Sequence, residues 1–198
     1  MNRMKLIQAT GEAIIPLAGY FFFDWNLYFI LLFYFIDLIA GEVFLHLKLK
    51  KILNYQGISD YFSRTRFYAA LNGLMICVII AGVHVPVRLL YPEISFKHEF
   101  IEFLMYEEAG IPIPQGFILL PLVILGNYQQ YKSNFLHPKR YRTLAYKQVT
   151  LSRRRALIFS LSGIVAGTIL AYFTNLPVFS YLLALIAVKF WVDLKYTS

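Results

Sequence analysis

The sequence is short of charged residues, and this shortage excludes most classes of soluble protein. Asp, Glu, Lys and Arg together make up 15% of the 198 residues, whereas soluble domains carry about 25%. Hydrophobic residues make up 59% of the chain. Water does not accommodate such a surface, whereas a lipid bilayer does. We therefore expect an integral membrane protein.

Cysteine is almost absent as well. Cys77 is the single cysteine of the chain, so no internal disulfide can form. It lies inside an apolar run, where we interpret it as a small packing residue. Cysteine usage therefore excludes a fold held by internal disulfides and does not indicate the redox compartment.

The chain contains long apolar runs instead of the mixture of apolar and polar residues that is typical of a soluble protein. A helix needs roughly 20 apolar residues to cross a bilayer, and six runs of about this length follow one another. Almost nothing separates the first two, so they should form a tight helical hairpin with Asp24 and Trp25 at its tip. The expected fold is all-α, a single polytopic bundle of six transmembrane helices. These spans lie near residues 4–23, 25–47, 67–90, 112–131, 156–174 and 176–194.

The basic residues predict the orientation of this bundle. Cytoplasmic loops of membrane proteins are enriched in Lys and Arg. All of the 19 basic residues except Arg88, Lys97 and Lys189 fall on one side of the six-span arrangement. This side is therefore expected to be cytoplasmic, and both the N and C termini belong to it. The expected location is a bacterial inner membrane.

The net charge of +8 would indicate nucleic-acid binding in a soluble chain. Here the positive charges cluster between apolar runs, where they set topology and contact anionic lipid head groups. Nucleic acid is therefore not an expected partner. The connection 132–155 contains no acid and is expected at the cytoplasmic head groups, with recognition of another anionic partner as the alternative. The expected head-group contacts are Lys139, Arg140, Arg142, Arg153, Arg154 and Arg155.

Two further patterns predict packing. Residues 95–108 place Phe96, Phe100, Phe103 and Leu104 on one helical face, which is typical of a short amphipathic helix lying in the outer membrane interface. In the third span, small residues recur every four positions and predict a seam for close helix packing, with contact between copies of the chain as the second interpretation. These residues are Ala69, Gly73, Cys77 and Ala81.

Ionisable residues inside the spans are the candidate functional residues. A charge near the centre of a bilayer costs about 2.5–3.5 kcal/mol even on the lenient insertion scale, so these side chains should turn toward neighbouring helices. Counted at about 1.5 Å per residue, all of them fall in the cytoplasmic half of the membrane. The predicted ion or substrate pathway consists of Glu12, Asp37, Glu42, His46, Lys189 and Asp193.

Helical phase predicts how these groups pair. Asp37 and Glu42 lie five residues apart, about 140° around the helix, and therefore face different neighbours. Lys189 is expected to pair with Glu42 or Asp193. That arrangement leaves Glu12 and Asp37 hydrogen-bonded, protonated or bound to a cation.

Three interpretations of this polar set stay open. It could hold the helices in register, it could conduct protons or cations or bind a substrate, or it could belong to a membrane-embedded enzyme. In the enzyme, Glu42 and His46 would offer two metal ligands, and Asp37, Glu12 or His84 would complete the set. The sequence indicates no particular metal or cofactor. A small transporter or channel is the leading hypothesis, and a non-catalytic scaffold, as a homo-oligomer or a subunit of a larger complex, is its rival.

The two ends of the chain also carry a family pattern. It consists of Pro16-Leu17-Ala18-Gly19, Trp25, Phe33-Tyr34-Phe35-Ile36-Asp37 and Leu47-Lys48, and of Lys189-Phe190-Trp191-Val192-Asp193-Leu194 near the end. The chain resembles an uncharacterised family of bacterial polytopic membrane proteins, a domain of unknown function, over the first two spans and the last. The resemblance implies an inner-membrane protein and no particular activity. It also implies that Asp37, Lys189 and Asp193 form one site.

Overall fold

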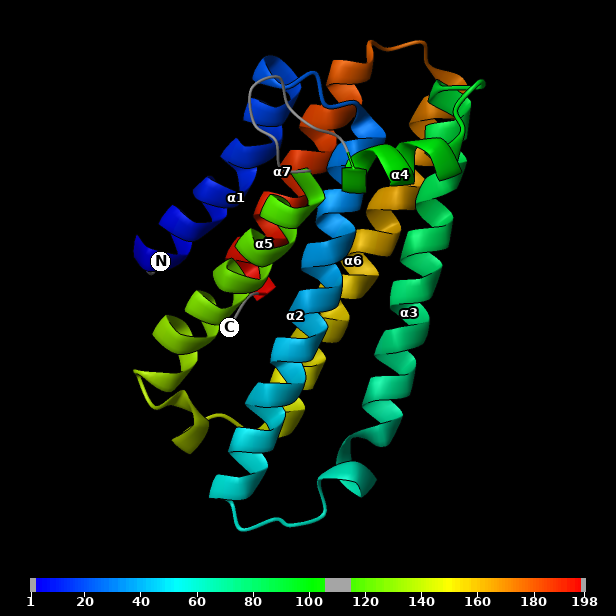
Figure 1. Cartoon of the computed structure of the whole chain (residues 1–198). Helices are drawn as coiled ribbons and strands as arrows, with labels where there is room; N and C mark the ends of the chain where they lie inside the picture. The colour runs from blue at the N-terminus through cyan, green and yellow to red at the C-terminus, as the bar shows by residue number, and fades with distance from the viewer. Residues whose placement is uncertain (1–2, 106–114, 197–198) are drawn as a thin grey trace.

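A computed structural model describes residues 3–105 and 115–196. Within these ranges the chain forms seven α-helices (Figure 1), so the expected all-α fold is confirmed. A π-helical turn, η1 (Lys132–Leu136), and a 3-10 turn, η2 (Arg140–Arg142), connect the fifth and sixth helices. The helices are α1 (Arg3–Phe22), α2 (Leu27–Tyr55), α3 (Tyr61–Leu90), α4 (Phe96–Met105), α5 (Gln115–Tyr131), α6 (Tyr146–Phe173) and α7 (Val178–Tyr196).

Three of these helices, α2, α3 and α6, are long and apolar enough to cross a membrane. This supports the expectation of a membrane protein. The helices α1, α5 and α7 are shorter, with 20, 17 and 19 residues. They carry the inward-facing polar groups described below.

The long helices continue past the predicted spans. We expected ends at residues 47, 67 and 156, whereas α2 runs to Tyr55, α3 begins at Tyr61 and α6 begins at Tyr146. Those expected ends marked the limits of the apolar runs. The lysines and arginines beyond these limits are good helix formers, so the backbone stays helical until a residue with a different backbone preference ends it.

Gly57 is the residue that ends α2. It has a φ of +71°, a left-handed conformation that glycine adopts without steric cost. The amide of Gly57 donates to the carbonyl of Asn54, and the amide of Ile58 donates to the carbonyl of Leu53. This pair of bonds is the Schellman motif, and it turns the chain toward α3.

Helix α2 is the centre of the bundle. It contacts α1, α3, α4, α5 and α6, and Figure 1 shows α1, α5 and α7 on one side of it and α3 and α6 on the other. Every residue from Leu27 to Phe35 is buried. This explains why the segment is apolar on all faces instead of amphipathic.

The predicted hairpin between α1 and α2 is present. Asn26 caps α2, because its side-chain oxygen accepts a hydrogen bond from the Phe29 amide at 2.8 Å. The Trp25 indole is buried and lies directly on Gly19, where a Cβ atom would overlap the ring. Glycine at position 19 therefore lets the two helices approach closely, and Asp24 at the tip is exposed with a φ of +49°.

The predicted short helix is α4, and residues 106–108 of the predicted range lie outside the described residues. Its apolar face lies differently from the prediction. Phe103 is 1% exposed and packs against Phe29, with ring centroids 4.6 Å apart, and Phe96 packs against Tyr28 and His84. Most of this face is therefore covered by the bundle, since α4 contacts α2 and α5, whereas we had expected it to face lipid.

The predicted small-residue seam of α3 does not form an internal packing surface. Cys77 and Ala81 are exposed, and a Cβ atom at Gly73 would meet no atom within 4 Å. The face of α3 that is buried carries Asn72, Ile76 and other residues instead. The prediction of internal packing was wrong because four-residue spacing identifies a face of a helix without showing which neighbour covers it. Contact of this face with another copy of the chain stays a prediction.

The two ends of the bundle differ in charge. The α2–α3 connection and the η1–η2 segment lie together at the lower end in Figure 1, whereas α4 and the α1–α2 and α6–α7 turns lie at the upper end. At the lower end, Lys51 and Arg142 lie over the ring of Tyr141, at 5.4 and 5.9 Å from its centroid. The acids Glu93, Glu99 and Glu102 belong to the upper end. We name the lower end the basic end.

Candidate functional site

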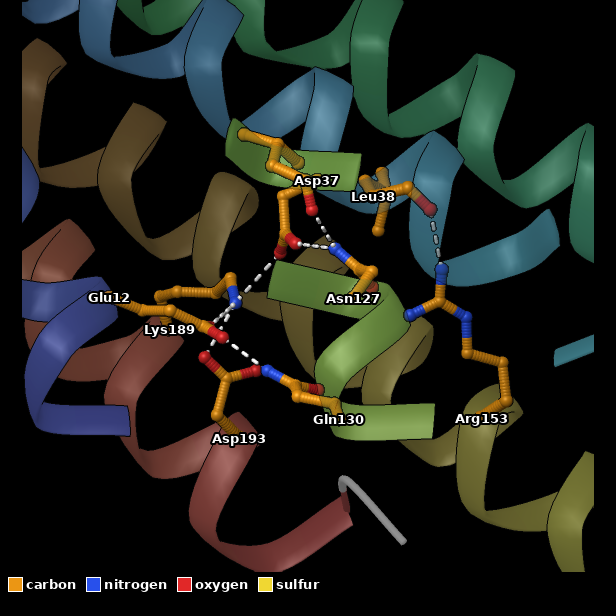
Figure 2. Close-up of polar contacts among 9 residues, drawn as sticks. Glu12, Asp37, Leu38, Asn127, Gln130, Arg153, Lys189 and Asp193 are labelled. Atoms are coloured by element: carbon orange, nitrogen blue, oxygen red, sulfur yellow. Dashed lines mark hydrogen bonds and ion pairs between the residues drawn. The ribbon is translucent and has the colours of Figure 1, made fainter. Parts of the chain in front are cut away.

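Lys189 is the centre of the main polar cluster (Figure 2). Its ammonium nitrogen lies 3.1 Å from a carboxylate oxygen of Glu12, 3.0 Å from Asp37 and 2.5 Å from Asp193. These three acids come from α1, α2 and α7. A lysine ammonium has three hydrogen-bond donors, so each carboxylate receives one of them. We name these four residues the ammonium cluster.

Two amides on α5 hold the carboxylates in place. The side-chain nitrogen of Asn127 donates to Asp37 at 2.7 Å and to the Val123 carbonyl at 3.1 Å. The side-chain nitrogen of Gln130 donates to Glu12. Amides at positions 127 and 130 lie three apart on one helical face, so α5 completes the cluster from the side opposite to Lys189.

A second network surrounds Glu42. One of its carboxylate oxygens accepts from Arg153 Nε at 3.0 Å, and the other accepts from Asn72 Nδ2 at 2.9 Å. His46 Nε2 lies 3.7 Å from the same carboxylate, and His46 Nδ1 lies 2.6 Å from the Tyr61 hydroxyl. This network joins α2, α3 and α6, and Glu42 is neutralised by an arginine from α6.

Gly41 makes room for that arginine. Arg153 Nη2 donates to the carbonyl of Leu38 at 2.7 Å, and a Cβ atom at Gly41 would lie 3.3 Å from the same nitrogen. The guanidinium therefore rests against a part of α2 that has no side chain. A larger residue at this position would push Arg153 away from Leu38.

The structure corrects the expected pairing of the charges. The pairing of Lys189 with Asp193 is present, but its alternative pairing with Glu42 is not, because Arg153 occupies that place. Glu12 and Asp37, which we expected to lack a basic partner, both contact Lys189. The resemblance implied that Asp37, Lys189 and Asp193 form one site, and the three residues do meet.

The expected head-group residues divide into two groups. Arg153 points into the bundle, and Arg154 lies over the ring of Tyr68 with its guanidinium carbon 5.4 Å from the centroid. Both had been placed in a connecting loop, whereas they lie on α6. Lys139, Arg142 and Arg155 are exposed and Arg140 is half-buried, so these four stay accessible at the basic end.

A cavity adjoins both networks. It measures about 90 Å³, which is room for several water molecules. The side chains of the ammonium cluster are between 15% and 25% exposed, so the cluster is reachable from outside the protein. The cavity is lined by all four residues of the ammonium cluster and by Gly41, Lys48, Asn127, Gln130, Tyr131 and Arg153, among others.

The charges of the ammonium cluster do not balance. Three carboxyl groups surround one ammonium, so the cluster carries a formal charge of −2 when all of them are ionised. Like charges this close repel each other strongly where water is scarce. A proton or a small cation bound beside the carboxylates would reduce this repulsion.

The alternative of a metal-dependent enzyme finds no matching arrangement in the described part of the chain. There, the His, Cys, Asp and Glu side chains form no group of three that could hold a metal ion. Glu42 is engaged by Arg153 and Asn72, and His84 is bonded to Tyr28 and to the Ile80 carbonyl, at 3.0 and 2.7 Å.

Sequence reasoning missed Asn127 and Gln130, and it placed Arg153 at the lipid head groups instead of inside the bundle. The two amides left a signal, since they stand three positions apart at the end of a largely apolar run. Arg153 left none, because it is one of three consecutive arginines. Comparison of the chain with family models, with curated proteins and with solved structures finds no match.

Proposed function

We propose that this protein is a polytopic membrane protein in which α1, α2, α3, α5, α6 and α7 cross the bilayer. The three long helices have the length and hydropathy of spanning segments. The other three pack beside them. α1 and α7 turn Glu12, Lys189 and Asp193 toward one another, and α5 turns Asn127 and Gln130 toward the same place, as membrane helices do with polar residues. The polar side chains are thereby sheltered by neighbouring helices.

The basic end then faces the cytoplasm of a bacterial cell, and both chain termini lie on that side. The basic residues near the adjoining ends of α2 and α3 and those of the η1–η2 segment gather at this one end, which supports this orientation. Exposed residues such as Arg142 would lie against the anionic head groups of the inner leaflet. The acids of α4 would lie on the opposite side of the membrane.

The proposed activity is the binding and transport of protons or small cations through the ammonium cluster. The observation that carries this proposal is the convergence of Glu12, Asp37 and Asp193 on the single ammonium of Lys189, beside a cavity. A proton or a cation that enters the cavity reduces the repulsion among the carboxylates. When the proton or cation leaves, that repulsion returns. Binding is therefore favoured by the repulsion among the carboxylates, and the hydrogen bonds to Lys189 limit how tightly the ion is held.

A structural role is the second candidate, and one observation favours it. Each of the three ammonium hydrogens of Lys189 already has a carboxylate partner, so the cluster is also a closed set of ion pairs that joins α1, α2 and α7. In that case the protein is a scaffold or a subunit of a larger membrane complex. Its charged side chains then stabilise the packing of the helices and carry no protons or cations across the membrane.

Flux through liposomes separates the two candidates. The purified protein, reconstituted with a pH-sensitive or cation-sensitive dye inside, should carry protons or cations above the rate of protein-free liposomes. Asp37→Asn and Lys189→Met should each lower this rate by about tenfold, the effect of removing roughly 1.4 kcal/mol of binding. Asp24→Asn and Lys50→Met change an exposed acid and an exposed lysine away from the cluster, and these controls should transport normally.

Two results would contradict the transport proposal. The first is a wild-type rate equal to that of protein-free liposomes, which leaves the scaffold. The second is an unchanged rate in both cluster variants when size-exclusion chromatography shows that they are folded.

A further inference from the structure

The Lys189 ammonium occupies a site that is built like a receptor for an ammonium group. Three carboxylates from three helices lie between 2.5 and 3.1 Å from its nitrogen, so each of them is within hydrogen-bonding distance of the ammonium. Two amides on α5 hold two of these carboxylates from behind. The ligand in this site is attached to the protein itself by its own side chain.

A fourth polar group lies beside the same site without a hydrogen-bond partner. The Tyr34 side chain is 8% exposed, and its hydroxyl is one of the buried groups with no partner among the described residues. Lys189 Nζ lies 5.8 Å from the centroid of its ring. A buried hydroxyl without a partner costs about 1–3 kcal/mol, so a polar ligand bound beside Tyr34 would recover this free energy.

Tyr34 also belongs to the cluster by its position in the sequence. It precedes Asp37 by three residues on α2, so the two side chains share one helical face. The ring offers its face to a cation, which is a favourable interaction, and the hydroxyl offers a lone pair. Neither contribution is needed to satisfy Lys189, whose three donors already have carboxylate partners.

We propose that the three carboxylates and Tyr34 form a binding site for free primary ammonium groups, and that Lys189 fills this site as a tethered competitor. The proposal rests on the proposed function and specifies its substrate class as ammonium ion or a small primary amine. Such a ligand reaches the carboxylates through the adjoining cavity when the Lys189 side chain withdraws. The Tyr34 ring then faces the bound cation, and its hydroxyl can accept the fourth N–H of an ammonium ion.

Chemical rescue of a lysine variant tests this proposal without any flux measurement. Lys189→Ala removes the tethered ammonium and leaves three carboxylates around an empty space, so its melting temperature in detergent should fall. Methylammonium or ethylammonium should raise the melting temperature of this variant by roughly 3–6 °C at ten times the dissociation constant. The wild-type protein should show a shift of less than about 1 °C under the same conditions. Tetramethylammonium at equal ionic strength is the matched control salt, because it has the charge and no N–H donor.

Several results would overturn the proposal. One is an equal stabilisation of Lys189→Ala by tetramethylammonium, sodium or potassium, which would indicate general charge screening or an alkali-ion site. Another is the absence of any stabilisation by primary amines. If Lys189→Ala does not fold, Lys189→Gln replaces it, because glutamine donates hydrogen bonds without a charge. The same amine titration on Lys189→Gln then tests the proposal by the same outcomes. Lys195→Ala removes an exposed lysine of the same helix and should show no rescue.

Tyr34→Phe in the Lys189→Ala background tests the fourth group. Ammonium ion has a fourth N–H donor, which the three carboxylates leave free for the Tyr34 hydroxyl. Loss of this hydrogen bond should weaken ammonium binding by about two- to tenfold, whereas Tyr172→Phe, at an exposed tyrosine, should leave it unchanged. Equal affinity in both variants would remove Tyr34 from the site. If amines stabilise the Lys189→Ala variant but the wild-type protein shows no flux in liposomes, the binding site is supported and the transport proposal is contradicted. If flux is observed but amines do not stabilise the variant, transport is supported and the amine site is contradicted.

Discussion

At the scale of single residues, two cations organise the polar interior, and each has a different task. Lys189 gathers three carboxylates that remain in excess over it, whereas Arg153 neutralises the single carboxylate of Glu42. Arginine suits the second task because its planar guanidinium can bind a carboxylate and a backbone carbonyl at the same time. The charge of Glu42 is therefore balanced by its arginine, whereas the ammonium cluster keeps unbalanced charge beside a cavity.

Removal of Arg153 should expose this difference. Arg153→Met leaves the Glu42 carboxylate, whose side chain is 13% exposed, without a cationic partner. We expect the free energy of unfolding to fall by roughly 3 kcal/mol, since breaking one side of a buried pair leaves an uncompensated charge. Thermal and denaturant unfolding in detergent would measure the loss.

The double variant Glu42→Gln with Arg153→Met should recover much of this stability, because the stranded charge is then gone. Arg155→Met is the matched control, as it removes an exposed arginine from the same helix and should change stability by less than about 0.5 kcal/mol. Equal losses for Arg153→Met and the double variant would show that Glu42 is not the partner that matters.

At the scale of helices, the apolar runs predicted where helices lie but not how long they are or which face they bury. The lengths of α2, α3 and α6 exceed the apolar runs, because basic residues continue a helix as well as apolar ones do. The hairpin of α1 and α2 was predictable, since its two spans have almost no residues between them. The role of Gly19 was not, because only the structure shows the Trp25 indole resting on it.

A methyl group at Gly19 should therefore disturb the hairpin. Gly19→Ala places a Cβ atom inside the Trp25 ring, and forcing the two helices apart should lower the free energy of unfolding by about 1–3 kcal/mol. Gly11→Ala is the matched control on the same helix, since its Cβ atom would meet nothing within 4 Å. Thermal unfolding followed by Trp fluorescence would compare them, and equal melting temperatures would contradict the close contact.

At the scale of the whole molecule, charge is distributed between two ends. The end of α2 and the η1–η2 segment are far apart in sequence, yet they pack together around Leu49, Ile52 and Phe135, which are fully buried. The fold thus gathers the lysines of this part of α2 and the basic residues of the η1–η2 segment at one end. The acidic α4 closes the other end, where Asn26 donates to Glu99 at 2.6 Å.

The proposed orientation predicts which end reacts with a reagent outside the cell. In a Cys77→Ala background, a membrane-impermeant maleimide should label Glu102→Cys in intact cells. Lys139→Cys should be labelled only after the membrane is opened, because it belongs to the basic end. Both positions are exposed in the structure, so a difference in labelling reports the side of the membrane. Labelling of Lys139→Cys from outside would contradict the orientation and, with it, the contact between the basic end and inner-leaflet lipids.

The sequence by itself determined the helical class, the approximate positions of the helices and the identity of most charged residues that turn inward. It did so because apolar length and the cost of a charge in lipid are local properties that each segment carries alone. Only the tertiary structure decided that Lys189 meets three acids while Arg153 takes Glu42, and that Asn127, Gln130 and Tyr34 surround the site. Those contacts depend on the rotation and height of five helices relative to one another, and no single helix encodes them.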